Sequence, residues 1–379
     1  MAKSRLLFVD NLRTLMIVLV ILVHLSITYG GVGGWYYYER PTTEPSFIIL
    51  AFFNAVCQSF FMGLLFLLSA YLAVGSYDRK GPRLFLRDRL LRLGVPLLVF
   101  EFVIHPFQLY PLIRAGALHI EGSFGDLLAR YYRSFHIGSG PLWFVETLLI
   151  FALVYTAIRV LVPRKPRPDA NLLAPPRTWV ILAFALVLGI LTFVIRLWFP
   201  FGWAFGPLNL QLCFFVQYIA MLVVGVVAYR NDWLVRVPKA TGRLALGLAV
   251  FLIAVVFPVM FILGGAAKGN EVVFFGGWHW QAFAYATWEQ FTCVAMITAL
   301  TVLFRERFNR QGRLAREASA SSYATYIIHA PVIILGALAV RHITIYPLLK
   351  FVLVSLVLVP LCFALAAGIR RLPGARRIV

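Results

Sequence analysis

The chain has 379 residues, of which 61% are hydrophobic and 13% are charged, and its mean hydropathy is +0.85. A soluble domain needs a more polar surface than this composition supplies, so a soluble fold is excluded. The formal net charge of +20 would suggest nucleic-acid binding in a soluble chain, but here the basic residues are placed as membrane topology requires, so no nucleic-acid partner is expected.

About ten segments are apolar over roughly 20 residues, the length that a helix needs to cross the hydrocarbon core of a bilayer. We therefore predict an all-α, polytopic membrane protein, with one integral membrane domain over residues 1–379. The predicted spans are 8–30, 47–74, 83–104, 141–162, 178–199, 208–229, 244–265, 281–304, 319–340 and 346–369.

The lysines and arginines are unevenly distributed between the predicted loops. Most of the 35 lie before the first span, in every second loop from the second span onward, and in the C-terminal tail. Loops rich in Lys and Arg remain in the cytoplasm. Both termini are therefore predicted to be cytoplasmic, with the protein embedded in the lipid of a bacterial inner (plasma) membrane.

The first span, FVDNLRTLMIVLVILVHLSITYG, carries Asp10, Arg13 and His24 in an otherwise apolar run. Arg13 and His24 lie on nearly one helix face, separated by about three turns and roughly 16 Å of rise. Ionisable residues within a membrane are costly and are candidates for function. The alternatives are a snorkelling arginine and a hydrogen-bonded packing histidine. Asp10 is expected to form an i, i+3 ion pair with Arg13.

Later spans add further candidates. Arg89 and Arg92 lie in the cytoplasmic half of the third span, Glu146 lies one turn into the fourth, and His329 lies in the ninth, one turn after Tyr326. Taken alone, Arg-x-x-Arg beside a span is typical of a topology signal, and an acid in the first turn is typical of a helix start. His329 fits a structural role as well as a catalytic one.

Three other features bear on the site. Glu289, inside the eighth span, is expected to face the protein interior. The longest outer segment, residues 105–140, is interpreted either as a cover over a site at the outer face or as a plain interfacial loop. The histidine spacing matches no metal-site pattern, and the four cysteines lie within spans, so no metal is expected.

Five motifs follow one another along the chain: RLLFVDNLRTLMIVLVILVH, FFMGLLFLLSAYL, FLRDRLLRLGVPLLV, GPLWFVETLLIF and SSYATYIIHAPVI. In this order they resemble the acyltransferase 3 family of integral membrane O-acyltransferases. The second motif departs from the family pattern, because Ser69-Ala70-Tyr71 stands where the family has a Ser-Gly-Phe-like turn. The first and third motifs look most like the branch that includes glucan succinyltransferases.

The resemblance implies transfer of an acyl group, acetyl or succinyl, from cytoplasmic acyl-CoA to a hydroxyl of an extracytoplasmic glycan or a related acceptor. Acyl-CoA would be the co-substrate, and Arg13, Arg89, Arg92 and Ser69 are the candidates for binding it. Guanidinium groups suit this role because they bind phosphate with planar donors that are always charged.

The resemblance also directs attention to the reacting groups. Transfer to a hydroxyl needs a base, and His24 is the best-placed histidine for that role. Glu146 is the second catalytic candidate, either orienting an imidazole or binding acceptor hydroxyls. Asp10, Tyr326 and His329 are secondary candidates. A continuous internal cleft, lined by the first, second and fourth spans, is expected to connect the arginines with His24.

Two other classes of protein remain open. A transporter or flippase for an anionic amphiphile would use the same basic entrance and polar interior without chemistry. A non-catalytic membrane scaffold would have no need for so many buried polar groups. Turnover of an acyl-CoA thioester distinguishes an enzyme from a carrier.

Overall fold

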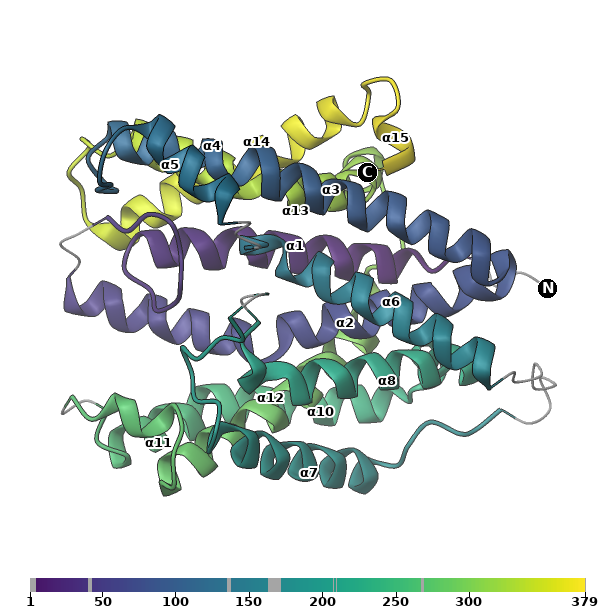
Figure 1. The fold of residues 1–379 in the computed structure, drawn as a ribbon. Coiled ribbons are helices and arrows are strands. Elements are labelled where there is room, and N and C mark those ends of the chain that lie inside the picture. Colours follow the sequence, from purple (N-terminus) through teal and green to yellow (C-terminus); the bar gives the residue numbers. More distant parts are fainter. Residues whose placement is uncertain are drawn as a thin grey trace.

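The computed structural model describes residues 5–39, 43–134, 138–162, 172–206, 208, 210–266 and 269–378. In this part of the chain, helices pack side by side in one bundle, and the only strand-like pairing is an isolated bridge (Figure 1). Nine helices within the described residues are long and apolar enough to cross a membrane. The predicted all-α polytopic fold is therefore confirmed.

The longest helices run the length of the bundle. They are α1 (Leu7–Thr28), α2 (Glu44–Arg89), α6 (Trp143–Leu161), α7 (Thr178–Arg196), α8 (Phe215–Asn231), α12 (Trp280–Arg307), α13 (Arg313–Ala339) and α14 (Pro347–Ile369). Others are shorter: α3 (Val95–Val99), α4 (His105–Arg114), α5 (Phe124–Arg133), α9 (Trp233–Arg236), α10 (Lys239–Phe251), α11 (Phe257–Leu263) and α15 (Ala375–Ile378). The first turn of α1 and α15 both lie toward the same end of the bundle (Figure 1).

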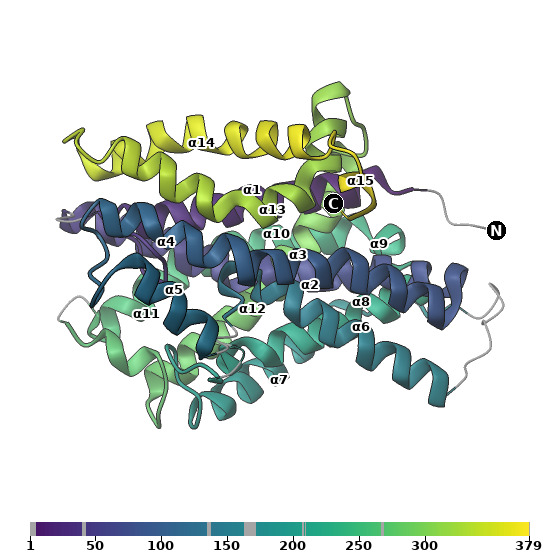
Figure 2. The ribbon, with the colours of Figure 1, turned by 45° about the horizontal axis from the view of Figure 1, so that its top comes forward.

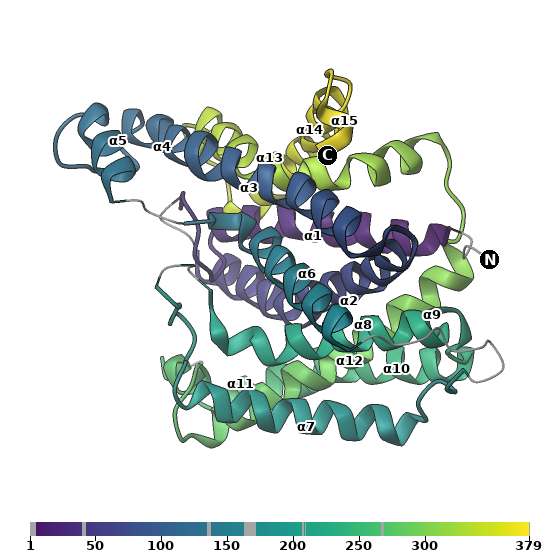
Figure 3. The ribbon, with the colours of Figure 1, turned by 45° about the vertical axis from the view of Figure 1, so that its right-hand side comes forward.

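The predicted second and third spans belong to one continuous helical run, Glu44–Arg114, of 71 residues. One crossing needs only about 20 residues. Gly81 has φ 72° and ψ 173°, a conformation that glycine adopts readily, and Pro82 follows it. The run reverses there, so that α2 and α3–α4 point in opposite directions (Figures 1 and 3). The two predicted spans are the two arms of this run.

Three π-helical turns interrupt the long runs, at Leu90–Gly94, Phe100–Ile104 and Leu252–Val256. Each ends two residues before a proline: Pro96, Pro106 and Pro258. A proline inside a helix has no N–H to donate, and its ring clashes with the carbonyl four residues earlier. The wider π turn relieves this clash and lets the helix continue.

The inside of the bundle is formed by α1, α2, α12 and α13. In the most apolar stretch of each of these helices, the buried share ranges from 50% in α1 to 61% in α12. In α7, which lies at the edge of the bundle, it is only 22% (Figure 1). Figure 2 shows α13 beside α1 and α14 outside α13. Helices that face lipid can leave apolar side chains uncovered, so ionisable groups are expected on the inner helices.

Candidate active site

The helices α1 and α13 run side by side in the same direction and hold candidate residues at matching heights. At one end, Arg13 Nη2 donates a hydrogen bond to the Ser319 carbonyl oxygen over 3.1 Å. About three turns further along, the rings of His24 and His329 lie 5.0 Å apart between centroids. The rise is roughly 16 Å along α1 and roughly 15 Å along α13. The two helices therefore give the site a basic end and a histidine end.

Each of the two imidazoles is oriented by its own helix. His24 Nδ1 lies 2.8 Å from the Val20 carbonyl oxygen, and His329 Nδ1 lies 2.5 Å from that of Tyr326. A carbonyl oxygen only accepts hydrogen bonds, so Nδ1 carries the proton in each neutral ring and Nε2 keeps a lone pair. Nε2 of His329 is buried and has no hydrogen-bond partner among the described residues, whereas His24 is partly exposed. Two basic nitrogens are thus available side by side.

Trp35, in the connection between α1 and α2, packs against this pair. Its ring centroid lies 4.1 Å from that of His24 and 6.3 Å from that of His329. The indole Nε1 is buried without a partner in the described structure. The connection is fixed at its far end by an ion pair between Glu39 and Lys350 of α14. Trp35 is therefore held against His24.

Arg89 and Arg92 lie at the junction of α2 with the first π turn. Tyr323 of α13 donates its hydroxyl to the Arg92 carbonyl oxygen over 2.5 Å, which brings this junction to α13 about 9 Å along the helix from His329. Arg89 Nε is buried with no partner among the described residues, and Arg92 Nε lies 3.3 Å from Asp88 Oδ1. The structure thus places both arginines at the basic end of the site.

The predicted pair between Asp10 and Arg13 is present, but Asp10 has a closer partner. Arg13 Nη2 lies 3.6 Å from Asp10 Oδ1, while Arg5 Nε lies 2.6 Å from Asp10 Oδ2. Arg13 Nε is buried and has no hydrogen-bond partner in the described part of the chain. Arg13, with 33% of its side chain exposed, therefore keeps one N–H that no described residue binds.

Two candidates lie apart from the histidine pair. Ser69 is half-buried on α2, and no described residue hydrogen-bonds to its hydroxyl. Glu146, on α6, is only 7% exposed; its carboxylate faces Ser139 and Glu101, and within the described residues it has no hydrogen bond to either histidine. This position fits the binding of acceptor hydroxyls better than the orientation of an imidazole.

Tyr326 makes different contacts from His329, which lies three residues later in the same motif. Its hydroxyl donates to the Pro141 carbonyl oxygen, and its ring lies 5.8 Å from that of Phe144, at the start of α6. Its own carbonyl oxygen accepts the hydrogen bond from His329 Nδ1. Tyr326 therefore joins α6 to α13 and positions His329.

Glu289 faces the interior, as predicted, and pairs with an arginine that the sequence reasoning did not single out. Arg196 Nη2, at the end of α7, lies 2.5 Å from Glu289 Oε2 on α12. Arg196 is 0% and Glu289 1% exposed. The guanidinium carbon also lies 4.3 Å from the Phe201 ring centroid. This pair joins α7 to α12 and is separate from the histidine pair.

Sequence reasoning also missed Trp35 and Glu101. Glu101 is 5% exposed, and its Oε1 accepts hydrogen bonds of 2.8 Å from the Tyr131 hydroxyl and from the Gly138 N–H. An acid in the otherwise apolar second half of the third span was a usable signal for Glu101. Trp35 carried no such signal, because aromatic residues just beyond a span are ordinary interfacial anchors.

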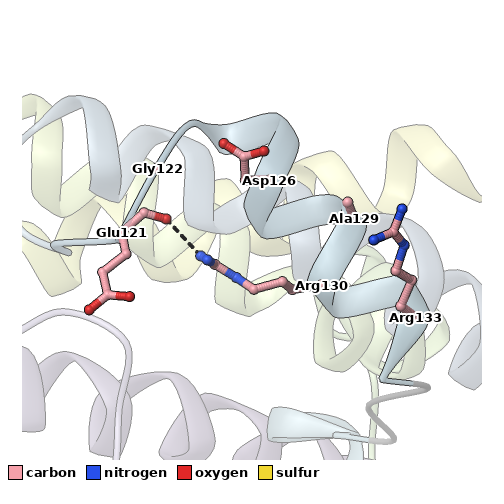
Figure 4. A pocket seen from close by; sticks show the side chains of 6 residues that line it. All are labelled: Glu121, Gly122, Asp126, Ala129, Arg130 and Arg133. Carbon is pink, nitrogen blue, oxygen red and sulfur yellow. Dashed lines mark hydrogen bonds between the residues drawn. The ribbon is translucent and has the colours of Figure 1, made fainter.

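The outer segment 105–140 contains α4 and α5. Ser123 caps α5, and its hydrogen bonds to Asp126 hold the pKa of that carboxyl below its usual value. A shallow cavity of about 380 Å³ lies against α5 (Figure 4), lined by Glu121, Gly122, Asp126, Ala129, Arg130 and Arg133. None of these six residues was a candidate from the sequence, so this cavity is not the predicted cleft. The cleft between the arginines and His24 stays a prediction.

The comparisons with known proteins identify the family of the chain. A family model described as an acyltransferase domain, that of the acyltransferase 3 family, matches residues 6–367, nearly the whole chain. The matched range contains both ends of the site, from Asp10 to His329. No curated protein and no solved structure matches the chain. The chain therefore belongs to the acyltransferase 3 family and is a membrane acyltransferase.

Proposed function

We propose that the protein is an O-acyltransferase that moves an acetyl or succinyl group from cytoplasmic acyl-CoA to a hydroxyl of a glycan or related acceptor outside a bacterial inner membrane. One observation carries the proposal. The parallel helices α1 and α13 hold two available imidazole nitrogens at one end and arginines with unpaired donors at the other.

The basic end suits the phosphates of CoA. Arg13 and Arg89 each have a buried Nε–H without a partner in the described structure, and Arg92, three residues after Arg89, is exposed. Guanidinium groups bind phosphate oxygens through charge-assisted, often bidentate hydrogen bonds. Asp10 would hold Arg13 in place, and Ser69 would add a hydroxyl from α2. The acyl thioester would then extend toward the histidine end.

The histidine end suits removal of the acceptor proton. Nε2 of His24 takes the proton as the acceptor oxygen attacks the thioester carbonyl carbon, and a C–O bond forms. The C–S bond then breaks, and the CoA thiolate leaves with the proton that the imidazolium returns. The hydrogen bond from Nδ1 to Val20 keeps the ring in the tautomer that this step needs. His329 lies beside it as a second base, positioned through Tyr326.

Turnover of the donor tests this function. Purified protein in detergent is incubated with acyl-labelled acetyl-CoA and, separately, succinyl-CoA, and free CoA is measured over time. We expect CoA release from at least one donor, faster when membranes that supply acceptor glycans are added. A protein that binds acyl-CoA but leaves both thioesters intact would be a carrier for an anionic amphiphile, and the proposal would be wrong.

A further inference from the structure

A second group of polar side chains lies near the outer end of the histidine pair, between α4, α6 and the connection after α1. We call it the outer polar cluster and define it as Tyr36, Glu101, Gln108, Ser139 and Glu146. Four of the five are more than nine-tenths buried: Glu101 is 5% exposed, Gln108 5%, Ser139 2% and Glu146 7%. Side chains this polar are seldom buried unless something binds them.

The members of the outer polar cluster face one another. The Tyr36 hydroxyl lies toward the Gln108 amide and the Glu101 carboxylate. Glu146 faces Ser139 and is close enough to Glu101 for the two carboxylates to repel each other. Burial, with a smaller contribution from Glu101, raises the pKa of the Tyr36 hydroxyl, which therefore stays a neutral donor. The five side chains form one polar surface rather than separate pairs.

The outer polar cluster is connected to the histidine pair through aromatic rings. Tyr36 passes over Gly140, where a Cβ would lie 2.3 Å from the tyrosine hydroxyl and where φ is +48°, so that glycine alone fits there without strain. The Tyr36 ring lies 5.3 Å from that of Trp35, which in turn lies 4.1 Å from that of His24. The contacts run without a break from the cluster to His24.

Tyr36 approaches Gln108 and Glu146 approaches Ser139, but most polar atoms of the outer polar cluster form no hydrogen bond of good geometry among the described residues. They are Tyr36 Oη, Glu101 Oε2, both amide atoms of Gln108, Ser139 Oγ and Glu146 Oε2. A buried polar atom without a partner is destabilising, and native proteins contain few of them. So many in one place indicate a surface built to bind a ligand with several hydrogen-bonding groups.

The charges of the outer polar cluster restrict that ligand. The protein partners of Glu101 are the Tyr131 hydroxyl and the Gly138 N–H, and those of Glu146 include no basic side chain in the described structure. Carboxylate oxygens accept hydrogen bonds from hydroxyls, and an amide both donates and accepts. The nearby basic side chain is His105, whose ring lies 5.6 Å from that of Tyr36 and whose Nδ1 lies 3.1 Å from the Tyr131 hydroxyl. Two carboxylates that form no ion pair with a described residue repel a third negative charge. The surface therefore matches an uncharged molecule with several hydroxyl groups.

We propose that the outer polar cluster is the acceptor site, and that it binds an uncharged sugar unit and disfavours an anionic one. The assignment to the acceptor rests on the acyl transfer proposed above, since the bound hydroxyl must reach His24. The sugar hydroxyls donate to Glu101 and Glu146, and Gln108 and Ser139 complete their hydrogen bonds. The Trp35 ring contacts both Tyr36 of this site and His24.

Binding of two matched probes, without acyl-CoA, tests the site directly. Purified protein is titrated with methyl glucoside, which is uncharged, and with methyl glucuronide, which differs by a carboxylate, and binding is followed by saturation-transfer NMR. We expect the glucoside to bind and the glucuronide to bind at least about tenfold more weakly. Absence of glucoside binding, or equal binding of both probes, would overturn the proposal.

Variants then test whether the outer polar cluster causes the preference for the glucoside over the glucuronide. In the double variant Glu101→Gln with Glu146→Gln, which keeps the side-chain size, we expect the preference against the glucuronide to fall at least about fivefold. Ser139→Ala is expected to weaken glucoside binding about two- to tenfold through loss of one hydrogen bond. The control is Glu121→Gln, an exposed acid outside the cluster, which should change neither value. An unchanged preference in the double variant contradicts the site.

These measurements distinguish failure of the proposed acyl transfer from failure of the proposed acceptor site. Acyl-CoA binding by each variant, measured by calorimetry, shows whether the protein is folded. If the glucoside binds with the expected preference but wild-type protein never cleaves acyl-CoA, the transfer reaction is wrong and the sugar site remains. If acyl-CoA is cleaved but neither probe binds, the transfer reaction remains and the acceptor site is wrong.

Discussion

His24 and His329 lie next to each other but differ in exposure, since His24 is partly exposed whereas His329 is 0% exposed. In the proposed transfer, a substrate would therefore reach His24 first. We expect His24→Ala to lower acyl transfer about 10²- to 10⁴-fold, the usual worth of a general base, while acyl-CoA binding is unchanged. Initial rates and calorimetry on the same preparation measure both. His279→Ala, at an exposed histidine, is the control, and a His24 variant with more than about a tenth of the activity would exclude this role.

The two arginines of the Arg-x-x-Arg motif are not equivalent. Arg92 already pairs with Asp88, while Arg89 Nε has no partner within the described residues. We expect Arg89→Ala to weaken acyl-CoA binding about 10- to 100-fold, since a hydrogen bond to a charged group contributes about 1.5–3 kcal/mol, and Arg92→Ala to weaken it less.

The same measurement on Arg89→Lys should show incomplete rescue, because an ammonium cannot reproduce bidentate contacts. Calorimetric titration with CoA measures these affinities, and added salt should reduce the difference between wild type and variants. Arg243→Ala, at an exposed arginine near the start of α10 in a predicted cytoplasmic segment, is the matched control. Affinity that is unchanged in the Arg89, Arg92 double variant would move the donor site elsewhere.

At the scale of elements, α2 and α8 pack closely against each other at a glycine. A Cβ on Gly225 of α8 would lie 2.3 Å from the Leu67 carbonyl oxygen of α2. We expect Gly225→Ala to force the helices apart and to cost about 1–3 kcal/mol, which lowers the unfolding temperature in detergent. Gly247→Ala on α10, where nothing lies within 4 Å of the added methyl, should have no such effect. Equal unfolding temperatures for the two variants would contradict this packing.

The ion pair between α7 and α12 makes a second prediction at this scale. Arg196→Met leaves the Glu289 carboxylate buried without its partner, and such a change costs about 3–5 kcal/mol. Replacing both residues together, with Glu289→Leu, removes the uncompensated charge and should recover much of that loss. Thermal unfolding of the two single variants and the double variant measures the coupling. If the double variant is no more stable than Arg196→Met, the pair does not join these helices.

The sequence predicts individual helices well but not the contacts between them. Apolar length predicts each span, and the turn between the second and third spans follows from Gly81 and Pro82, although helical structure continues through it. Periodicity shows which face of a helix is buried but not which helix covers it. The contact between the rings of His24 and His329, 305 residues apart along the chain, and the packing of Trp35 against them therefore required the structure.

For the whole molecule, the arrangement of the site gives the reaction a direction. The arginines lie at the end of the bundle to which the charge pattern assigns the cytoplasm, and the histidine pair and the outer polar cluster lie toward the other end. An acyl group bound at the first end and accepted at the second would cross the membrane core within the protein. The product should therefore appear on glycans outside the cell.

Mass spectrometry of surface glycans tests this claim most directly. Glycans are compared between cells that carry the wild-type gene, cells without the gene, and cells with His24→Ala at equal protein level. We predict acetylated or succinylated glycan species with the wild-type gene, and their absence from the other two. Identical glycan spectra from all three, or an acyl-bearing species that persists with His24→Ala, would contradict transfer to an outer acceptor through this histidine.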